Sequence, residues 1–410
     1  MQKKINALSF FCIKFNQRKL LFFARKLVMD FIPRGLTQLL EQHTPPKACV
    51  LFGPRRAGKT TLLRMFANGR DVSWYDGDDR AQIASYLNLP SSADVKTLLM
   101  SSECIIIDEA QRVPDIGLLI KRLVDANTWQ DKKVPIFATG SSSLELSAGV
   151  RESALGRLVE LYVWPLSTAE IAATTSWGST LQSINTRIVY GMYPEVYTNP
   201  GEARNILIDH CRSLLFKDLF DLSGIRFSPK FESLVQFLAY NIGSVISYDG
   251  LSRETSLSKN TVIDYLRLLE QCFIIKVCPS YAKNMSNEMR KGKKVFFCDN
   301  GIRNAIIRDF SPLSTRSDAG ALWENFFFME RVKYHSLKRD FADIYFWRTT
   351  GYSQKEIDFV EVLDNVKMRA FECKLSANAK AKGAESFTKA YPDCPLDIVT
   401  PRDLMRLWQE

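Results

Sequence analysis

The feature that most constrains this chain is a glycine-containing loop between an apolar run and a helical pattern. Residues 48–52 have the composition of a buried strand, and residues 60–68 repeat apolar side chains at helical spacing. The segment between them fits the pattern G-x-x-x-x-G-K-[ST] and reads Gly53-Pro54-Arg55-Arg56-Ala57-Gly58-Lys59-Thr60. At average glycine content, this pattern arises by chance about once in a hundred chains of this length. A strand, this loop and a helix in succession predict a phosphate-binding loop, rather than a glycine turn with an exposed lysine.

The residue types of the loop suit a nucleotide triphosphate. Its glycines allow the backbone to curve around phosphate oxygens with the N–H groups pointing inward, and the following helix adds its positive N-terminal end. Lys59 would reach the β- and γ-phosphates of ATP, and the Thr60 hydroxyl would bind Mg²⁺. The predicted ATP-binding residues are Gly53, Pro54, Arg55, Arg56, Ala57, Gly58, Lys59, Thr60 and Thr61.

Two acidic residues follow a second buried run. Residues 104–107, Cys-Ile-Ile-Ile, predict a strand that brings Asp108 to the carboxyl edge of a sheet, beside the loop. There Asp108 would complete the Mg²⁺ shell, and Glu109 would act as the general base on the attacking water. The alternative is an acidic pair at the start of a helix, where its charge favours the helix dipole.

A polar segment follows a further strand predicted over residues 134–138. It reads Thr139-Gly140-Ser141-Ser142-Ser143. A polar side chain there would lie between the carboxylates and the γ-phosphate, where it could sense hydrolysis. Ser141 is our first choice for this role and Thr139 the next. A serine-rich cap for the following helix is an alternative that is compatible with it.

Apolar strands separated by helices predict an α/β domain with a parallel sheet covered on both faces. From residue 166 to about 225 the pattern is mostly helical. Residues 228–282 then read helix, turn, helix and strand, with Ser258 as the cap of the second helix, which is the outline of a winged helix-turn-helix. Its basic and polar residues would suit a DNA groove or, alternatively, a protein-docking surface. They are Lys259, Asn260, Thr261 and Arg267.

Strands return near the C-terminus, around a long helix over residues 321–334. They are predicted at residues 295–298, 344–347, 357–362 and 369–372. Asp358 followed on the next strand by Glu372-x-Lys374 resembles the restriction-endonuclease-like PD-(D/E)xK fold. In that fold Asp358 and Glu372 would hold Mg²⁺, Lys374 would stabilise the attacked phosphate, and Glu324 would be the helical acid. Cross-strand ion pairs are the alternative explanation for these charges.

Several of these motifs recur together in one known family. They resemble segments of the prokaryotic AAA-superfamily ATPases that carry a C-terminal domain of unknown function. These segments are the loop 53–60, Ile106-Ile107-Asp108-Glu109-Ala110-Gln111, the segment 139–143, Gly156-Arg157 and residues 164–167. Residues 31–34 and 294–304 are similar to other segments of that family. The resemblance covers about residues 29–400. It implies further strands beside the loop, and a role for Arg157 on the γ-phosphate in its own or a neighbouring subunit. A surface ion pair is the alternative for Arg157.

We therefore predict five parts and a reducing, cytoplasmic location. They are a basic N-terminal extension (1–28), an AAA-type ATP-binding core (29–165), a helical lid (166–227), a winged helix-turn-helix (228–282) and a nuclease-like α/β domain (283–410). The predicted function is Mg²⁺-dependent ATP hydrolysis that acts on nucleic acid. The alternative is a nucleotide-gated switch that binds a protein partner and has an inactive nuclease-like domain.

Composition adds limits to this prediction. The net charge is +10, but residues 1–28 carry seven basic and no acidic residues, so the remainder is only about +3 and is weak evidence for DNA binding. Those 28 residues lack the features of a secretory signal. They are either a basic helix on a membrane surface or a translation upstream of a start at Met29. No run reaches the roughly 20 apolar residues of a membrane span, and the nine cysteines include no Cys-x-x-Cys pair.

Overall fold

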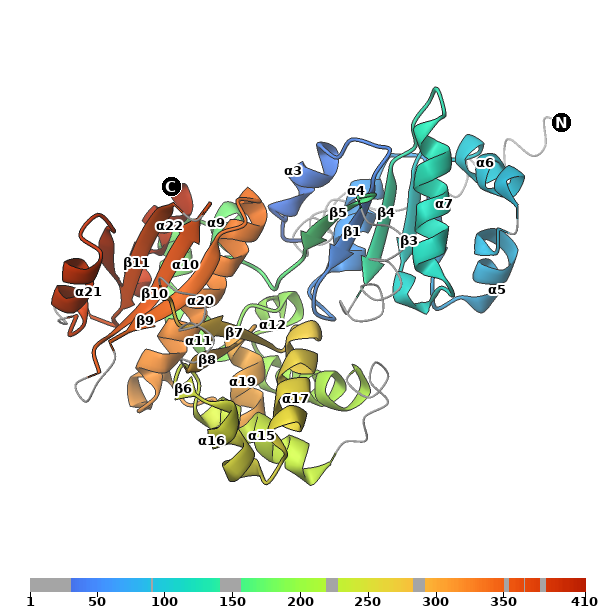
Figure 1. The fold of residues 1–410 in the computed structure, drawn as a ribbon. Coiled ribbons are helices and arrows are strands. Elements are labelled where there is room, and N and C mark those ends of the chain that lie inside the picture. The colour runs from blue at the N-terminus through green and yellow to red at the C-terminus, as the bar shows by residue number, and fades with distance from the viewer. Residues whose placement is uncertain are drawn as a thin grey trace, which may run out of the picture. The chain divides into compact units, whose positions relative to one another are not determined.

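The computed structural model describes residues 31–89, 91–140, 156–218, 228–282, 292–349, 354–364, 366–376 and 381–410. Residues Arg34–Glu410 form one compact unit, and Figure 1 labels its elements.

The N-terminal half of this unit contains a five-stranded parallel sheet in the order β2-β3-β4-β1-β5. Its strands are β1 (Ala48–Phe52), β2 (Ser73–Asp76), β3 (Ile105–Asp108), β4 (Ile136–Gly140) and β5 (Leu158–Tyr162). Every residue of β1, β3 and β4 is buried, as expected for central parallel strands covered on both faces. The predicted parallel α/β core is therefore confirmed. β5 has a single charged residue, Glu160, and its short run did not predict a strand from the residues alone.

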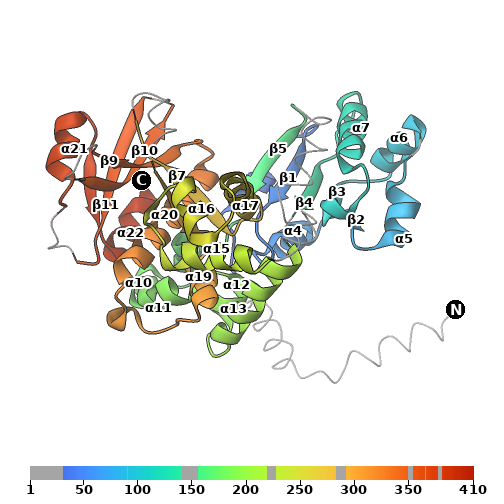
Figure 2. The same ribbon diagram turned by 60° about the horizontal axis from the view of Figure 1, so that its bottom comes forward.

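Helices cover both faces of this sheet. Helix α4 (Lys59–Ala67) packs Leu62, Leu63 and Phe66 against Cys49 and other side chains of one face, together with α3 (Leu36–Glu41). Helix α7 (Ile116–Thr128) lies on the opposite face (Figure 2). Because the strands are parallel, all their carboxyl ends meet at one edge, and the phosphate-binding loop follows β1 at that edge.

The described part of residues 166–218 is helical, as predicted. Its helices are α9 (Thr168–Thr174), α10 (Trp177–Gln182), α11 (Ile184–Tyr190), α12 (Pro194–Thr198) and α13 (Ala203–Arg212). Ser167 begins α9 with a capping box, in which its hydroxyl accepts from Glu170 N and the Glu170 carboxylate accepts from Ser167 N.

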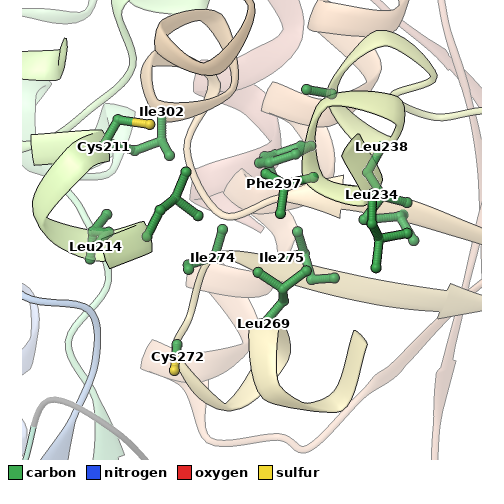
Figure 3. Close-up of a cluster of buried hydrophobic side chains, with 14 of the residues drawn as sticks. Cys211, Leu214, Leu234, Leu238, Leu269, Cys272, Ile274, Ile275, Phe297 and Ile302 are labelled. Atoms are coloured by element: carbon green, nitrogen blue, oxygen red, sulfur yellow. The ribbon is translucent and has the colours of Figure 1, made fainter. Parts of the chain in front are cut away.

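The next segment has helix α15 (Pro229–Tyr240), α16 (Tyr248–Thr255), α17 (Lys259–Gln271) and α19 (Asn300–Ile307) around a small sheet. Ser258 caps α17 through its hydroxyl, as predicted. Figure 3 shows Leu234 and Leu238 of α15, Leu269 of α17 and Phe297 in the shared apolar core.

That small sheet differs from the prediction in one strand. It has the order β6-β8-β7, with β6 (Val245–Ile246), β7 (Ile275–Pro279) and β8 (Lys293–Phe297) paired antiparallel. The sequence placed residues 295–298 with the C-terminal strands, but β8 pairs with β6 and β7 instead. The reason is a non-local pairing, since Ile275 pairs with Phe297 and both side chains enter the core of α15 and α17.

The C-terminal part has a separate four-stranded sheet, β12-β11-β10-β9. Its strands are β9 (Asp343–Arg348), β10 (Glu356–Leu363), β11 (Lys367–Cys373) and β12 (Leu396–Val399). The first three are antiparallel, and β12 is parallel to β11 after helix α21 (Ala384–Ala390). The long helix α20 (Ala319–Lys338) buries Trp323, Phe326 and Phe327. A second α/β unit is confirmed here.

Candidate nucleotide-binding site and a C-terminal charge cluster

The loop after β1 has the backbone that its glycines predict. Gly53 has φ +150°, and a Cβ there would lie 2.2 Å from the carbonyl oxygen of Val163. Gly58 has φ +96° and directly precedes α4. Side chains are unfavourable at both places, the first for lack of space and the second because a left-handed backbone disfavours them. The two glycines therefore permit the close turn that places the start of α4 beside the end of β1.

Lys59 and Thr60 are the first two residues of α4. The Lys59 side chain is buried, and its ammonium donates to the carbonyl oxygens of Gly53 (2.7 Å) and Pro54 (2.9 Å). The Thr60 hydroxyl donates to Asp108 Oδ1 at 3.1 Å. The structure thus brings together the loop, the loop lysine and the carboxylate predicted to share the metal, although Thr60 and Asp108 are 48 residues apart.

Thr139 completes this group from β4. Its hydroxyl donates to Asp108 Oδ1 at 2.6 Å and accepts a hydrogen bond from the backbone N–H of Glu109 at 2.9 Å. Thr139 and Asp108 are both buried. Ser141, our first choice for the sensing position, lies outside the described residues. The second choice, Thr139, is in direct contact with the predicted acids.

Glu109 has an unusual backbone. Its φ is +48°, in the left-handed region that costs a non-glycine residue about 1 kcal/mol. Its carboxylate accepts a hydrogen bond from Gln111 Nε2 at 2.5 Å. Gly77, after β2, allows this conformation, because a Cβ at Gly77 would lie 2.3 Å from the Glu109 carbonyl oxygen. Strain held in this way is typical of residues with a function.

Arg34 supports the loop from outside it, and sequence reasoning did not single it out. Its guanidinium donates to Ala57 O (2.7 Å), to Trp164 O (2.5 Å) and to Glu170 Oε1 (2.9 Å). These partners are 23 to 136 residues away in the sequence. The only local signal is the position of Arg34 just before the core.

Arg157 lies far from the loop within its own chain. Its carbonyl oxygen accepts from the N–H of Ala48, the first residue of β1, so Arg157 is at the amino edge of the sheet. The loop follows the carboxyl end of the same strand. The Arg157 side chain forms a bidentate ion pair with Asp125 of α7, at 2.6 and 3.2 Å. This geometry fits the alternative of a surface ion pair, and a role in a neighbouring subunit stays a prediction.

Of the acids predicted for the C-terminal site, Asp358 lies near the start of β10, Glu372 near the end of β11, and Glu324 on α20. Asp358 Oδ2 accepts from the N–H of Cys373 at 2.7 Å, and Glu372 Oε1 accepts from Lys374 Nζ at 2.7 Å. The other oxygen, Glu372 Oε2, is buried and has no hydrogen-bond partner among the described residues. Burial raises the pKa of Glu372, and the nearby charge of Asp358 raises it further.

A second lysine, which sequence reasoning missed, lies in this cluster. Lys294 of β8 pairs with Glu324 Oε1 of α20 at 2.8 Å and with Glu356 Oε1 of β10 at 2.5 Å. Its side chain is only 2% exposed. Burial raises the pKa of Glu324 to about 8 and also raises that of Asp358. Across the described ranges, no group of three or more His, Cys, Asp or Glu side chains is arranged to hold a metal ion.

The polar residues predicted to contact a partner lie along α17. Lys259 pairs with Asp249 at 3.0 Å, and Arg267 pairs with Asp264 at 3.8 Å. The helix carries two basic and two acidic residues in all.

The residues around the loop fit ATP with Mg²⁺. Backbone N–H groups of the loop and the ammonium of Lys59 suit phosphate oxygens, and the oxygen atoms of Thr60 and Asp108 are hard ligands of the kind that Mg²⁺ prefers. The parallel sheet, the loop and these acids define a P-loop nucleotide-binding domain.

Comparison with known families gives the class of this domain. Residues 45–172 match the family model described as an AAA domain. Residues 181–313 and 319–404 match two models that are each described as a domain of unknown function, DUF8612 and DUF4143. The first match and the site geometry both support a P-loop nucleotide-binding domain in residues 45–172, which are similar to AAA domains.

Similar proteins occur in bacteria and archaea. An uncharacterized protein of Mycobacterium tuberculosis is 25% identical over 78% of this chain and 68% of its own length. An uncharacterized protein of Methanocaldococcus jannaschii is 23% identical over 87% of this chain and 81% of its own. Among solved structures, the Walker-type ATPase of Pyrococcus abyssi aligns with a TM-score of 0.47 and 16% identity, over 68% of this chain and 97% of that one. Among the described helices, none is long and apolar enough to cross a membrane.

Proposed function

We propose that this protein is a Mg²⁺-dependent ATPase in which Glu109 is the general base. The observation that carries the proposal is the hydrogen-bonded group at the carboxyl edge of the sheet. There the Thr60 and Thr139 hydroxyls share one oxygen of Asp108, and Thr139 also accepts from Glu109 N. Glu109 therefore follows directly after the acid that would bind the metal.

Each residue of the site has a role that its chemistry supports. Lys59 would stabilise the negative charge on the β- and γ-phosphates, and the loop N–H groups would fix their position. Thr60 and Asp108 would hold Mg²⁺, which neutralises charge on the phosphates when it is bound. Glu109 would orient a water molecule and take its proton. Gln111, which donates to the Glu109 carboxylate, would set the direction of that side chain.

The test is the steady-state ATPase rate of the wild type and of Glu109→Gln, each with and without DNA. We expect the variant to bind ATP tightly and to hydrolyse it about 100- to 10,000-fold more slowly, since a general base contributes this much. Glu103→Gln is the matched control, because Glu103 is exposed at the other end of the β3 region and pairs with Lys132. An unchanged rate in Glu109→Gln would remove Glu109 from the mechanism.

The second part of the proposal concerns what ATP turnover serves. One candidate is rearrangement on nucleic acid, and the other is a nucleotide-gated switch that binds a protein partner, with slow hydrolysis as a timer. The balanced charge of α17 supports the second. Its Lys259 and Arg267 each have an acidic neighbour, so this helix offers little net positive charge to the phosphates of DNA.

The same ATPase measurement and a DNA titration distinguish the two candidates. Turnover that is stimulated by DNA, together with DNA affinity that falls steeply with salt, would favour action on nucleic acid. Slow turnover that does not respond to DNA but changes with a co-purifying protein would favour the switch.

We also propose that residues 319–404 have the nuclease-like fold. The succession of α20, three antiparallel strands, α21 and the parallel strand β12 supports it, as does the proximity of Asp358 to the β11 end that carries Glu372 and Lys374. A plasmid-nicking assay with Mg²⁺, with Asp358→Asn as the control, tests for catalysis. Nicking that Asp358→Asn abolishes would make this domain an active nuclease.

A further inference from the structure

Lys294 is a buried cation that neither the ATPase nor the expected nuclease residues account for. It belongs to β8, and therefore to the three-stranded sheet with β6 and β7. Its side chain leaves that sheet and contacts two carboxylates from other elements, Glu324 of α20 and Glu356 of β10. A lysine that is only 2% exposed is rare in proteins unless it is paired in this way.

The surroundings keep Lys294 charged. Its ammonium lies 2.8 Å from Glu324 Oε1 and 2.5 Å from Glu356 Oε1, and two carboxylates at such distances favour the charged form of a buried lysine. The ammonium also lies 5.5 Å from the ring centre of Phe346, whose face attracts a cation. A permanent positive charge is thus fixed inside the cluster.

The position of this charge matters for metal binding. Glu324 and Asp358 are two of the acids that a nuclease-like site would use to hold Mg²⁺, and the ammonium of Lys294 donates a hydrogen bond to Glu324 Oε1 at 2.8 Å. A divalent cation bound to these acids would lie a few ångström from the ammonium, and like charges at such a distance in a buried site repel strongly. The residues present therefore do not fit a metal ion at Glu324.

We propose that the ammonium of Lys294 is the resident cation of the C-terminal carboxylate cluster and takes the place of a divalent ion there. In this arrangement the wild-type cluster holds no Mg²⁺, and part of its negative charge is neutralised by Lys294 from within the chain. The same contact joins the β6-β8-β7 sheet to α20 and to the β9–β12 sheet. The inference rests on the nuclease-like fold proposed above and is independent of ATP hydrolysis.

Removing the ammonium should convert the cluster into a metal site. In Lys294→Met the acids Glu324 and Glu356 lose their ion-pair partner, whereas Glu372 keeps its bond to Lys374 and has a second oxygen, Oε2, without a hydrogen-bond partner among the described residues. Carboxylate oxygens without a neutralising charge favour a hard divalent cation.

The experiment measures Mn²⁺ binding to the nucleotide-free protein by the loss of the free-ion EPR signal, together with the change in Tm on adding Mn²⁺. The proteins are the wild type, Lys294→Met, Lys294→Arg and Lys293→Met, each with and without Asp358→Asn. Lys293→Met is the matched control, because Lys293 is the neighbour of Lys294 on β8 and lies over the Tyr248 ring instead. The paired Asp358→Asn proteins subtract any ion held at the phosphate-binding loop.

We expect Lys294→Met to gain Asp358-dependent Mn²⁺ binding, about tenfold or more tighter than the wild type, and a Tm that rises with Mn²⁺. The wild type, Lys294→Arg and Lys293→Met should show no such binding. If Lys294→Met does not fold without metal, refolding by Mn²⁺ would support the proposal. In that case the double variant Lys294→Gln/Glu356→Gln is measured as well, because it removes one positive and one negative side chain and so disturbs the charge of the cluster less.

Three results would overturn the proposal. The first is Asp358-dependent Mn²⁺ binding by the wild type itself. The second is a folded Lys294→Met or Lys294→Gln/Glu356→Gln protein that gains no Mn²⁺ affinity. Wild-type nicking of DNA that depends on Asp358 would also contradict it while leaving the nuclease-like fold intact, so the two proposals fail separately.

Discussion

The hydroxyl of Thr139 donates a 2.6 Å hydrogen bond to Oδ1 of Asp108, although the two residues come from different strands and lie 31 positions apart. The same oxygen accepts from Thr60 and from the N–H of Glu109. One carboxylate oxygen thus joins the ends of β3 and β4 to the start of α4. A displacement of any one of these ends would therefore change the hydrogen bonds of the other two.

Thr139→Val should slow hydrolysis more than it weakens binding. Valine keeps the shape but removes the hydrogen bond to Asp108 and the acceptor for Glu109 N. Hydrogen bonds to charged groups contribute about 1.5–3 kcal/mol, so we expect the turnover number to fall about 10- to 100-fold. Thr128→Val is the control, because the Thr128 hydroxyl bonds only its own helix, at Val124 O. A Thr139→Val enzyme with normal turnover would show that the bond to Asp108 does not position the reacting groups.

Gly77→Ala should impair hydrolysis without touching any expected ligand. A Cβ at Gly77 would lie 2.3 Å from the Glu109 carbonyl oxygen, so the backbone of Glu109 must move. Since a small misplacement of a catalytic group can cost about 100-fold in rate, we expect a loss of that order in turnover, measured beside nucleotide affinity. Gly201→Ala is matched to it, because a Cβ at Gly201 would meet no atom within 4 Å. Equal turnover in the two variants would argue against a role for the Glu109 conformation.

The acid stability of the C-terminal part should depend on Glu361. Burial by itself would raise the pKa of this carboxyl, but hydrogen bonds from Arg331 at 2.6 and 2.8 Å help to bring it down to about 2 from 4.5. A group whose pKa falls on folding stabilises the protein above its unfolded pKa. Here that contribution is about 3 kcal/mol, and it is lost as the pH falls from about 4.5 toward 2.

Thermal unfolding of the wild type and Glu361→Gln between pH 7 and pH 3 checks this expectation. The difference in Tm should narrow as the pH falls below 4.5. Glu385→Gln, which changes an exposed acid of α21, should show little difference at any pH. If the difference in Tm between the wild type and Glu361→Gln stays the same down to pH 3, the ion pair of Arg331 with Glu361 does not lower the pKa of Glu361.

The nucleotide site was predictable because its signal is local. The strand before Gly53, the loop and the helix after Lys59 are consecutive in the sequence, and Asp108 directly ends an apolar strand. The contact of Thr139 with Asp108 was not predictable, because Thr139 and Ser141 follow the same apolar run. Only the end of β4 at Gly140 places Thr139 against Asp108.

The contacts that the sequence did not predict join distant segments. Arg34 reaches Ala57 and Trp164, and β8 pairs with β7 rather than with its expected neighbours. Lys294 of β8 pairs with Glu324 of α20, which lies 30 residues away in the sequence. One feature of the sequence indicated this ion pair. Lys294 directly precedes the apolar run 295–298, and a charge that is buried beside such a run must be paired.

The most direct test of the account is the affinity of Lys59→Ala for ATP with Mg²⁺, measured by calorimetry beside the wild type and Lys96→Ala. Lys96 is an exposed lysine of α6 (Ser92–Met100) and serves as the control. Because the ammonium of Lys59 would bond two phosphate groups, we expect its loss to weaken binding about 100-fold, with Lys96→Ala unchanged. A folded Lys59→Ala protein that binds ATP as tightly as the wild type would contradict the nucleotide site described above.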